Sequence, residues 1–371
     1  MNGKVKKALA FFMAGVLAMG TLAGCSSEGG KDSTAAGTQG AGTAAGTQAA
    51  GSENAGGDAG DYPNQAITGV STFSTSSGTF SDAVKICGLA EQFLGGSITV
   101  VDRAGGSGAV GTDFVYSSKP DGYTLLCGTD SVSLFGVMEL SDITYDDFIP
   151  VLLAYGKVFY LIGNKDSKYN CLQDLIDDAK ANPGRVTVAI TGAGSVPAVW
   201  FSLFAKHFDV QFNIVQYEGN GDAMTALMGG HVDAFITNTQ QSLSYVESGD
   251  VKPITLLFDN DIPILEGTEK LSEAYPELAK YSGFGNFFQI SVHKDTPQAI
   301  VDKLKDAFLQ AYNTPEFQQY IEDNGHAPLG ISGDEAIEYE KRHQSMASYI
   351  MYDVGATEIN PADLGIERLA E

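Results

Sequence analysis

The stretch that most constrains the fold is YEGNGDAMTALMGGHVDAFITN, residues 217–238. Apolar runs at 212–217 and 232–236 predict a strand on each side of a short helix. The helix follows a turn at 219–221 and ends at Gly229-Gly230. A strand–helix–strand unit of this kind presents unpaired backbone N–H groups at the helix N-terminus, where an anion can bind without a cationic side chain.

A second unit of the same kind lies just upstream. Residues 185–190 predict a strand, 191–195 a turn, and 196–208 a helix. Ser195 is a favourable N-cap residue, and Pro197 falls in the first turn, where its missing N–H costs little. The two units therefore place two helix N-termini at neighbouring strand ends.

The first residues have the pattern of an export signal. Three lysines at positions 4, 6 and 7 precede an apolar run at 8–22, which is too short for a typical membrane span. The tetrad Leu22-Ala23-Gly24-Cys25 resembles a bacterial lipobox, which implies cleavage after residue 24 and a lipid on Cys25. An ordinary signal peptide or a buried cysteine is the alternative. We expect an extracytoplasmic protein anchored to the outer face of the cell membrane.

Residues 25–61 form a Gly/Ala/Thr-rich tether. From 26 to 61 they include no aromatic or large aliphatic residue, so we expect a disordered segment. The whole chain has a formal net charge of −24; removal of residues 1–24, with three lysines and no acids, gives about −27 (−24 − 3). This charge excludes a nucleic-acid partner, and it means that any anionic ligand must be bound by local dipoles.

The cysteines after Cys25 do not form a disulfide framework. Cys87, Cys127 and Cys171 are odd in number and irregularly spaced. Buried thiols are the favoured interpretation, and a single bridge stays open as the alternative.

Alternating strands and helices predict two α/β lobes. We assign residues 62–163 and 284–371 to the first lobe and 164–283 to the second, with two chain crossings between them. Strand ends that face each other across such a junction are where ligands bind in α/β proteins. The sequence therefore predicts a ligand cleft between the lobes.

Several motifs resemble those of the solute-binding receptors of tripartite tricarboxylate transporters, the Bug-type receptors. The Gly-rich turn at 103–108 with Gly111 is similar to the family's NRPGAGG, and 120–125 reads PDGYTL as in the family. Further matches are GAGS at 192–195, YEG at 217–219, and the Leu227, Gly229-Gly230 and Val232-Asp233 positions. Each motif is weak alone, but their order and spacing through residues 62–355 are characteristic.

The resemblance implies a two-lobed, periplasmic-binding-protein-like (Venus flytrap) α/β fold. It also implies a monomeric receptor, without catalysis, cofactor or metal, that captures a small carboxylate and delivers it to integral membrane permease subunits. Carried over by position, and with two neighbouring residues included, the expected ligand-binding residues are Ser76, Ser77, Gly78, Thr79, Phe80, Thr129, Asp130, Ser131, Gly194, Ser195, Tyr217, Gly219, Asn220, Gly221 and Asn238.

Two positions depart from the family pattern. Phe80 stands where the family has Asp, and Ala198 stands where it usually has His. An aromatic residue in place of a carboxylate suggests a ligand with an apolar portion and no ammonium group.

Other functions were weighed against the receptor. Residues 106–111 fit the dinucleotide pattern GxGxxG, with Asp130 after the next strand, but a tight turn explains them better in an exported protein. Ser195 lacks the GxSxG frame of a nucleophile, and the five histidines show no metal-binding spacing. A secreted hydrolase acting on a small carboxylic acid derivative in the same cleft, and a sensor module without a permease, stay as alternatives.

Overall fold

The computed structural model describes residues 60–75, 77–192, 195–259 and 261–368. The predicted signal peptide, Cys25 and the tether up to residue 59 lie outside these residues, as do Ser76 and Gly194 of the predicted site. All elements below belong to one compact unit, residues 55–371. In the described ranges, no helix combines the length and the apolar character that a bilayer crossing requires.

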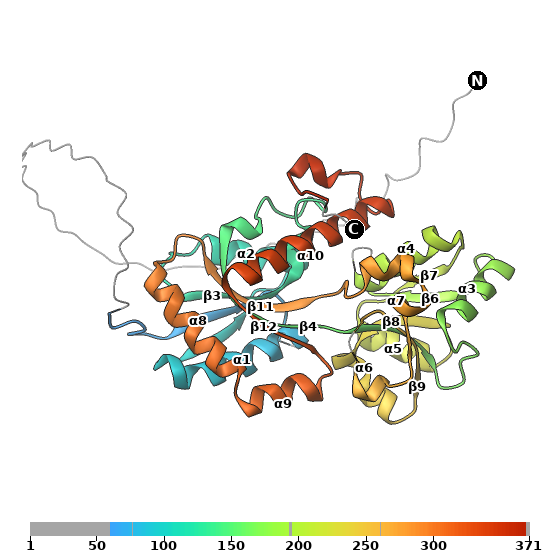
Figure 1. The fold of residues 1–371 in the computed structure, drawn as a ribbon, viewed down its shortest axis with the longest axis horizontal. Helices are drawn as coiled ribbons and strands as arrows, with labels where there is room; N and C mark the ends of the chain where they lie inside the picture. Colours follow the sequence, from blue (N-terminus) through green and yellow to red (C-terminus); the bar gives the residue numbers. More distant parts are fainter. Residues whose placement is uncertain (1–59, 76, 193–194, 260, 369–371) are drawn as a thin grey trace, which may run out of the picture. The chain divides into compact units, whose positions relative to one another are not determined.

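The first sheet has the strand order β12–β4–β11–β3–β1–β2 (Figure 1). Strand β1 pairs in parallel with β2 and β3, whereas β11 is antiparallel to β3 and β4, and β12 is antiparallel to β4. The strands are β1 (Ile67–Ser71), β2 (Ile98–Asp102), β3 (Thr124–Thr129), β4 (Phe148–Gly156), β11 (Phe287–His293) and β12 (Ala327–Ile331). The helices of this lobe are α1 (Gly78–Leu94), α2 (Ala109–Tyr116), α8 (Gln298–Tyr312), α9 (Pro315–Asp323) and α10 (Gly333–Asp353).

The second sheet has the order β10–β9–β5–β8–β6–β7. Its strands are β5 (Phe159–Asn164), β6 (Thr187–Ile190), β7 (Asn213–Gln216), β8 (Ala234–Asn238), β9 (Val251–Leu256) and β10 (Glu269–Lys270). Its helices are α3 (Leu172–Ala181), α4 (Val196–Phe208), α5 (Asn220–Met228), α6 (Thr239–Glu247) and α7 (Leu271–Ala274). Short 3-10 helices in the chain are Gly106–Gly108, Asp130–Leu134, Tyr145–Asp147, Pro263–Leu265, Pro276–Tyr281 and Pro361–Leu364.

Helix α1 shows how the local sequence sets an element and its packing. The Ser77 hydroxyl caps the N-terminus by accepting from the Phe80 N–H at 3.2 Å, and Gly95 ends the helix in the left-handed conformation with φ 75°. Between these ends, apolar residues at helical spacing are buried against the first sheet: Ala83, Ile86, Cys87, Ala90 and Leu94. Burial of this face orients the N-terminus of α1, and that end lies at the cleft described below.

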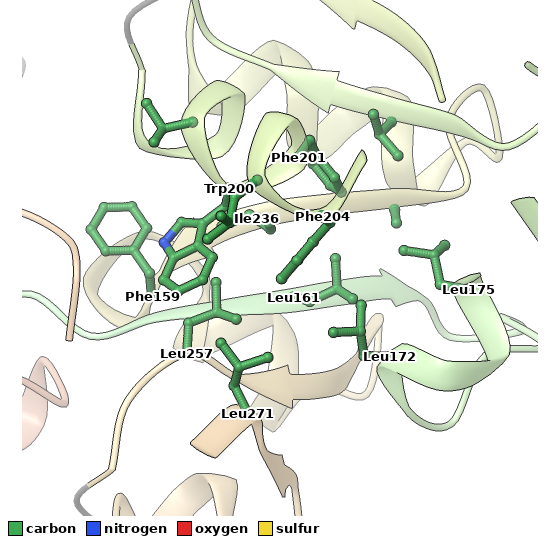
Figure 2. Packing of buried hydrophobic residues seen from close by; sticks show 14 of the residues in the cluster. Phe159, Leu161, Leu172, Leu175, Trp200, Phe201, Phe204, Ile236, Leu257 and Leu271 are labelled. Carbon is green, nitrogen blue, oxygen red and sulfur yellow. The ribbon is translucent and has the colours of Figure 1, made fainter. Parts of the chain in front are cut away.

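The second sheet packs against an aromatic core built around Trp200 (Figure 2). Helix α4 contributes Trp200, Phe201 and Phe204, all fully buried, because three-residue and four-residue spacing places them on one helix face. The C-terminal half of α10 joins this core through Ala347, Ile350 and Met351. Helix α10, which we assigned wholly to the first lobe, therefore contacts both.

Three local expectations differ from the structure. Strand β5 pairs with β8 and β9, so the first crossing lies at 157–158 and the second lobe begins before residue 164. Helix α6 and strand β12 were not predicted: α6 is a polar sequence with few buried residues, and β12 is a short strand of five residues. The structure contains no disulfide bond among the described cysteines, since Cys87, Cys127 and Cys171 are all free. The Sγ atoms of Cys87 and Cys127 nevertheless lie 3.9 Å apart.

Candidate ligand cleft

A cavity of about 540 Å³ is lined by loops and helix ends from both sheets. It brings together many of the predicted site residues, namely Ser77, Gly78, Thr79, Thr129, Asp130, Ser131, Ser195, Asn220 and Asn238. Phe80, Tyr217, Gly219 and Gly221 do not line it. Tyr217 packs instead against the apolar core under α5, and the Phe80 N–H bonds the Ser77 cap.

The N-terminus of α1 contributes a free donor to this cavity. Thr79 is only 6% exposed, lines the cavity and has no hydrogen-bond partner among the described residues. A Cβ added to Gly78 would lie 2.5 Å from the Gln240 Oε1 atom, so the start of α1 and the start of α6 approach closely here. Glycine at position 78 permits this close approach of the two helix ends.

The N-terminus of α4 differs from our expectation. The Ser195 hydroxyl donates its proton to the Gly192 carbonyl at 2.7 Å and accepts from the Ala198 N–H at 3.4 Å. Pro197, in the first turn, has no N–H. Ser195 is therefore a helix cap whose proton is already used, and it is not a donor free to bind a carboxylate in this conformation.

The starts of α5 and α6 form a small amide network. The side-chain NH₂ groups of Asn220 and Asn238 both donate to the Gln241 Oε1 atom, the second at 3.1 Å. The Asn238 Oδ1 atom in turn accepts from the Gln241 N–H at 3.2 Å and caps α6. The Gln241 NH₂ group has no partner in the described part of the chain, so it supplies a second free neutral donor.

Asp130 is the carboxylate of the cavity wall. Its Oδ1 atom accepts from the Asn286 NH₂ group at 2.6 Å, and its Oδ2 atom lies 3.8 Å from the His343 Nε2 atom. Burial, at 4% exposure, raises the pKa of Asp130 above its usual range although His343 and Asn286 oppose the shift. Nearby, the Thr129 and Ser131 hydroxyls share a hydrogen bond of 3.1 Å.

The residue that sequence reasoning missed most clearly is Lys157, at the first crossing. It lines the cavity and is 7% exposed. Its ammonium group lies 3.0 Å from the Asp82 Oδ2 atom and donates to the Gln240 Oε1 atom at 3.1 Å. Burial raises the pKa of the Asp82 carboxyl, but the charge of Lys157 and a Tyr320 hydrogen bond outweigh it and hold that pKa below its usual range.

A signal for Lys157 was present in the sequence. It is the one charged residue in the otherwise apolar run FIPVLLAYGKVFYLIG at 148–163. A lysine in such a run is rarely buried without a paired charge. Its partner Asp82 lies far away in the chain, on α1, and only the fold identifies it.

The cavity also has an apolar wall that we did not predict. Its members come from five segments of the chain: Phe73, Leu134, Met138, Leu140, Phe159, Val196, Pro197 and Phe284. Phe159 and Phe284 are buried parts of the Trp200 core, and Leu134, Met138 and Val196 pack against that core. The apolar wall is thus the part of the second lobe's hydrophobic core that borders the cavity.

Two other cavities contain none of the predicted residues. One, of about 440 Å³, lies beside α10 and includes Arg342, Tyr349 and Arg368; the Arg368 guanidinium is paired with Asp353 at 2.8 and 2.9 Å. The other, of about 830 Å³, is lined by α9, the start of β12 and the 261–264 loop. The 540 Å³ cavity is the candidate site because it joins free donors at the N-termini of α1 and α6 with residues from both lobes.

Comparisons with known proteins agree with this geometry. The model of the family described as "Tripartite tricarboxylate transporter family receptor" matches residues 84–351. Protein BugT of Bordetella pertussis (strain Tohama I) is 27% identical over 282 residues, which cover 75% of this chain and 85% of BugT.

Solved structures show the same fold. A TctC solute binding protein from Polaromonas has a TM-score of 0.68 at 22% identity, with 79% of this chain and 99% of that chain covered. The R. palustris protein Rpa4515, solved with adipate, has a TM-score of 0.70 at 22% identity, with 80% and 99% covered. The predicted two-lobed, periplasmic-binding-protein-like α/β fold is confirmed by these likenesses.

Proposed function

Because the chain belongs to the tripartite tricarboxylate transporter receptor family, we propose that it captures a small carboxylate outside the cell membrane and delivers it to the integral subunits of a tripartite-type permease. In this proposal the two lobes close on the ligand, and the permease recognises the closed form. The relative Rpa4515, with adipate in its structure, is consistent with a carboxylate ligand for this chain as well.

The observation that carries the proposal is the free Thr79 hydroxyl at the N-terminus of α1. This hydroxyl has no hydrogen-bond partner in the described chain, so it can donate to a ligand that enters the cavity. The helix dipole and the first-turn N–H groups favour an anion at the same place. Gln241, at the start of α6, offers a second neutral donor from the other lobe. A carboxylate held between these donors would draw the lobes together.

The cleft gives little support to the alternative of a secreted hydrolase. Ser195 donates its proton to a backbone carbonyl, and no histidine is among the described residues that line the cavity. A serine nucleophile needs a base within hydrogen-bond reach. The proposal is therefore a receptor that returns its ligand unchanged, and incubation with a carboxylate ester should yield no product.

We further propose that residues 1–24 are removed and that a lipid on Cys25 anchors the chain through the 25–61 tether. This rests on the sequence pattern alone, since these residues lie outside the described structure. Replacing Cys25 by Ser should move the protein from the membrane fraction to the soluble extracytoplasmic fraction. Retention of Cys25→Ser in the membrane would contradict lipid anchoring.

Calorimetry and tryptophan fluorescence test the receptor proposal directly. Trp200 is the single tryptophan of the chain, and its indole N–H donates to the carbonyl of Phe284, a residue of the cleft wall. We expect a bound carboxylate to change Trp200 emission in a saturable way. At about 100 times its Kd, the ligand should also add roughly 2.7 kcal/mol to the free energy of unfolding. The proposal fails if mono-, di- and tricarboxylates all leave both signals unchanged.

A further inference from the structure

The cleft is lined both by neutral hydrogen-bond donors and by apolar side chains, and from this lining we infer that its ligand is an amphipathic monocarboxylate, in which one carboxylate is carried on an apolar body. The inference rests on the proposed function and names the ligand class for the same cleft. It depends on three features of the lining: the neutral donors, the charged groups, and the apolar side chains.

The polar part of the lining offers neutral donors for one carboxylate. The free Thr79 hydroxyl stands at the start of α1, and Gln241 stands in the first turn of α6. The close approach of Gly78 to Gln240 shows that these two helix ends adjoin. Thr79 is 6% exposed and has no hydrogen-bond partner in the described chain, so its hydroxyl can donate to a carboxylate oxygen of the ligand.

The charged groups of the cleft do not suit a second carboxylate. Lys157 is the sole cation among the described cleft residues, and its ammonium group is already paired with Asp82 at 3.0 Å. The other ionisable group is Asp130, a carboxyl that supplies no positive charge for a second carboxylate. The net charge of −24 of the chain further disfavours a second negative charge on the ligand. A dianion would thus bury one charge without a counter-charge.

The apolar part of the lining fits a hydrocarbon body. Phe159 and Phe284 expose an edge of the Trp200 core to the cavity, and Figure 2 shows Phe159 and Trp200 within the same packed cluster. Leu134, Met138 and Val196 border the same core, so these side chains form one continuous surface. With a volume of about 540 Å³, the cavity has room for a chain or ring beyond the carboxylate.

A pair of acids of equal carbon number tests this inference on the full-length protein. We expect calorimetry to show hexanoate binding at least tenfold more tightly than adipate. Along the series acetate, butanoate and hexanoate, affinity should rise by about fourfold for each buried methylene. 6-Aminohexanoate, with an ammonium group at the apolar end, should bind more weakly than hexanoate.

Two methionine variants test whether the apolar wall contributes to binding, as distinct from any effect of a Met→Gln change elsewhere in the protein. Met138→Gln places an amide in the apolar wall, and we expect it to weaken hexanoate binding about tenfold while adipate changes less than twofold. Met228→Gln is the matched control, because Met228 is 38% exposed at the end of α5 and does not line the cleft. It should leave both affinities unchanged.

The possible outcomes distinguish failure of the monocarboxylate assignment from failure of the proposed function. Tighter binding of adipate than of hexanoate, or equal effects of the two methionine variants, would overturn the monocarboxylate assignment and leave the proposed function standing. Binding of no carboxylate at all would overturn the proposed function and this inference with it.

Discussion

Thr79 and Ser195 look alike in the sequence, as hydroxyl residues at helix starts, but the structure gives them different roles. Thr79→Val removes a free hydroxyl at nearly constant volume, and we expect it to weaken carboxylate binding by about 1.5–3 kcal/mol, the range for hydrogen bonds to charged groups. Its stability should hardly change. Thr99→Val, at an exposed position of β2, is the control and should bind normally.

Ser195→Ala should behave in the opposite way. It removes the cap of α4, so the free energy of unfolding should fall by about 0.5–2 kcal/mol in denaturant titrations. Ligand affinity should change less than in Thr79→Val, since the Ser195 proton is bound to Gly192. An affinity loss larger than that of Thr79→Val would mean that Ser195 turns toward the ligand when the cleft closes.

His326 is a buried group whose protonation opposes folding. It is 4% exposed, stacks on Tyr155 with ring centroids 4.0 Å apart, and neither ring nitrogen has a hydrogen-bond partner in the described structure. Burial, with the neighbouring Lys157 charge, lowers its pKa from 6.5 to about 3. Because the unfolded chain then binds the proton more readily, stability attributable to His326 falls as pH drops from about 6.5 toward 3.

The variant His326→Phe tests this effect. It keeps the stacking on Tyr155 and removes the titrating group. Relative to the parent protein, the variant should be more stable at pH 5 than at pH 8 by about 2 kcal/mol, from 1.5 pKa units at about 1.4 kcal/mol each. Equal differences at the two pH values in denaturant unfolding would show that folding does not lower the pKa of His326.

At the scale of elements, α10 packs against the Trp200 core of the second sheet. Met351 and Ile350 of α10 are buried in the Trp200 cluster with α4. Met351→Ala should lower the free energy of unfolding by about 2–5 kcal/mol, the range for large-to-small changes in cores. Tyr352→Ala, at a neighbouring exposed position, should cost much less. Similar costs for the two would place Met351 outside the core.

The two chain segments that cross between the lobes contact each other. The Lys157 N–H donates to the Asn286 carbonyl at 2.7 Å, which joins the two crossings directly. The side chains of Lys157, Asp82 and Gln240 extend this link to α1 and α6. A buried ion pair of this kind is costly to break from one side, so the crossings form a defined connection and not a loose linker.

At the scale of the whole molecule, charge opposes the function that we propose. The net charge of −24 repels an anion at long range, whereas the donors of the cleft act only at short range. Raising the ionic strength from 0.01 to 0.15 M shortens the screening length from about 30 to 8 Å. We therefore expect carboxylate affinity to rise with salt over this range. A fall with salt would indicate a cation that binds the ligand directly.

Much of the site could be predicted because it is local in the chain. Helix caps and small-residue turns at strand ends are set by sequence neighbours, and Ser77, Thr79, Asn220 and Asn238, which we predicted as ligand contacts, line the cavity. Turn residues that serve the backbone, such as Gly219 and Gly221, could not be told from lining residues, because the sequence does not show which side of a turn faces the ligand.

The sequence by itself determined the alternation of strands and helices, the family motifs and the acidic charge, since these depend on residue types at short spacing. Only the tertiary structure decided that Lys157 is neutralised by Asp82, that the Ser195 proton is already used, and that Phe159, Phe284 and Met138 form one apolar wall. The physical reason is distance along the chain: pairing of buried charges and packing of an apolar surface depend on contacts between segments far apart in sequence.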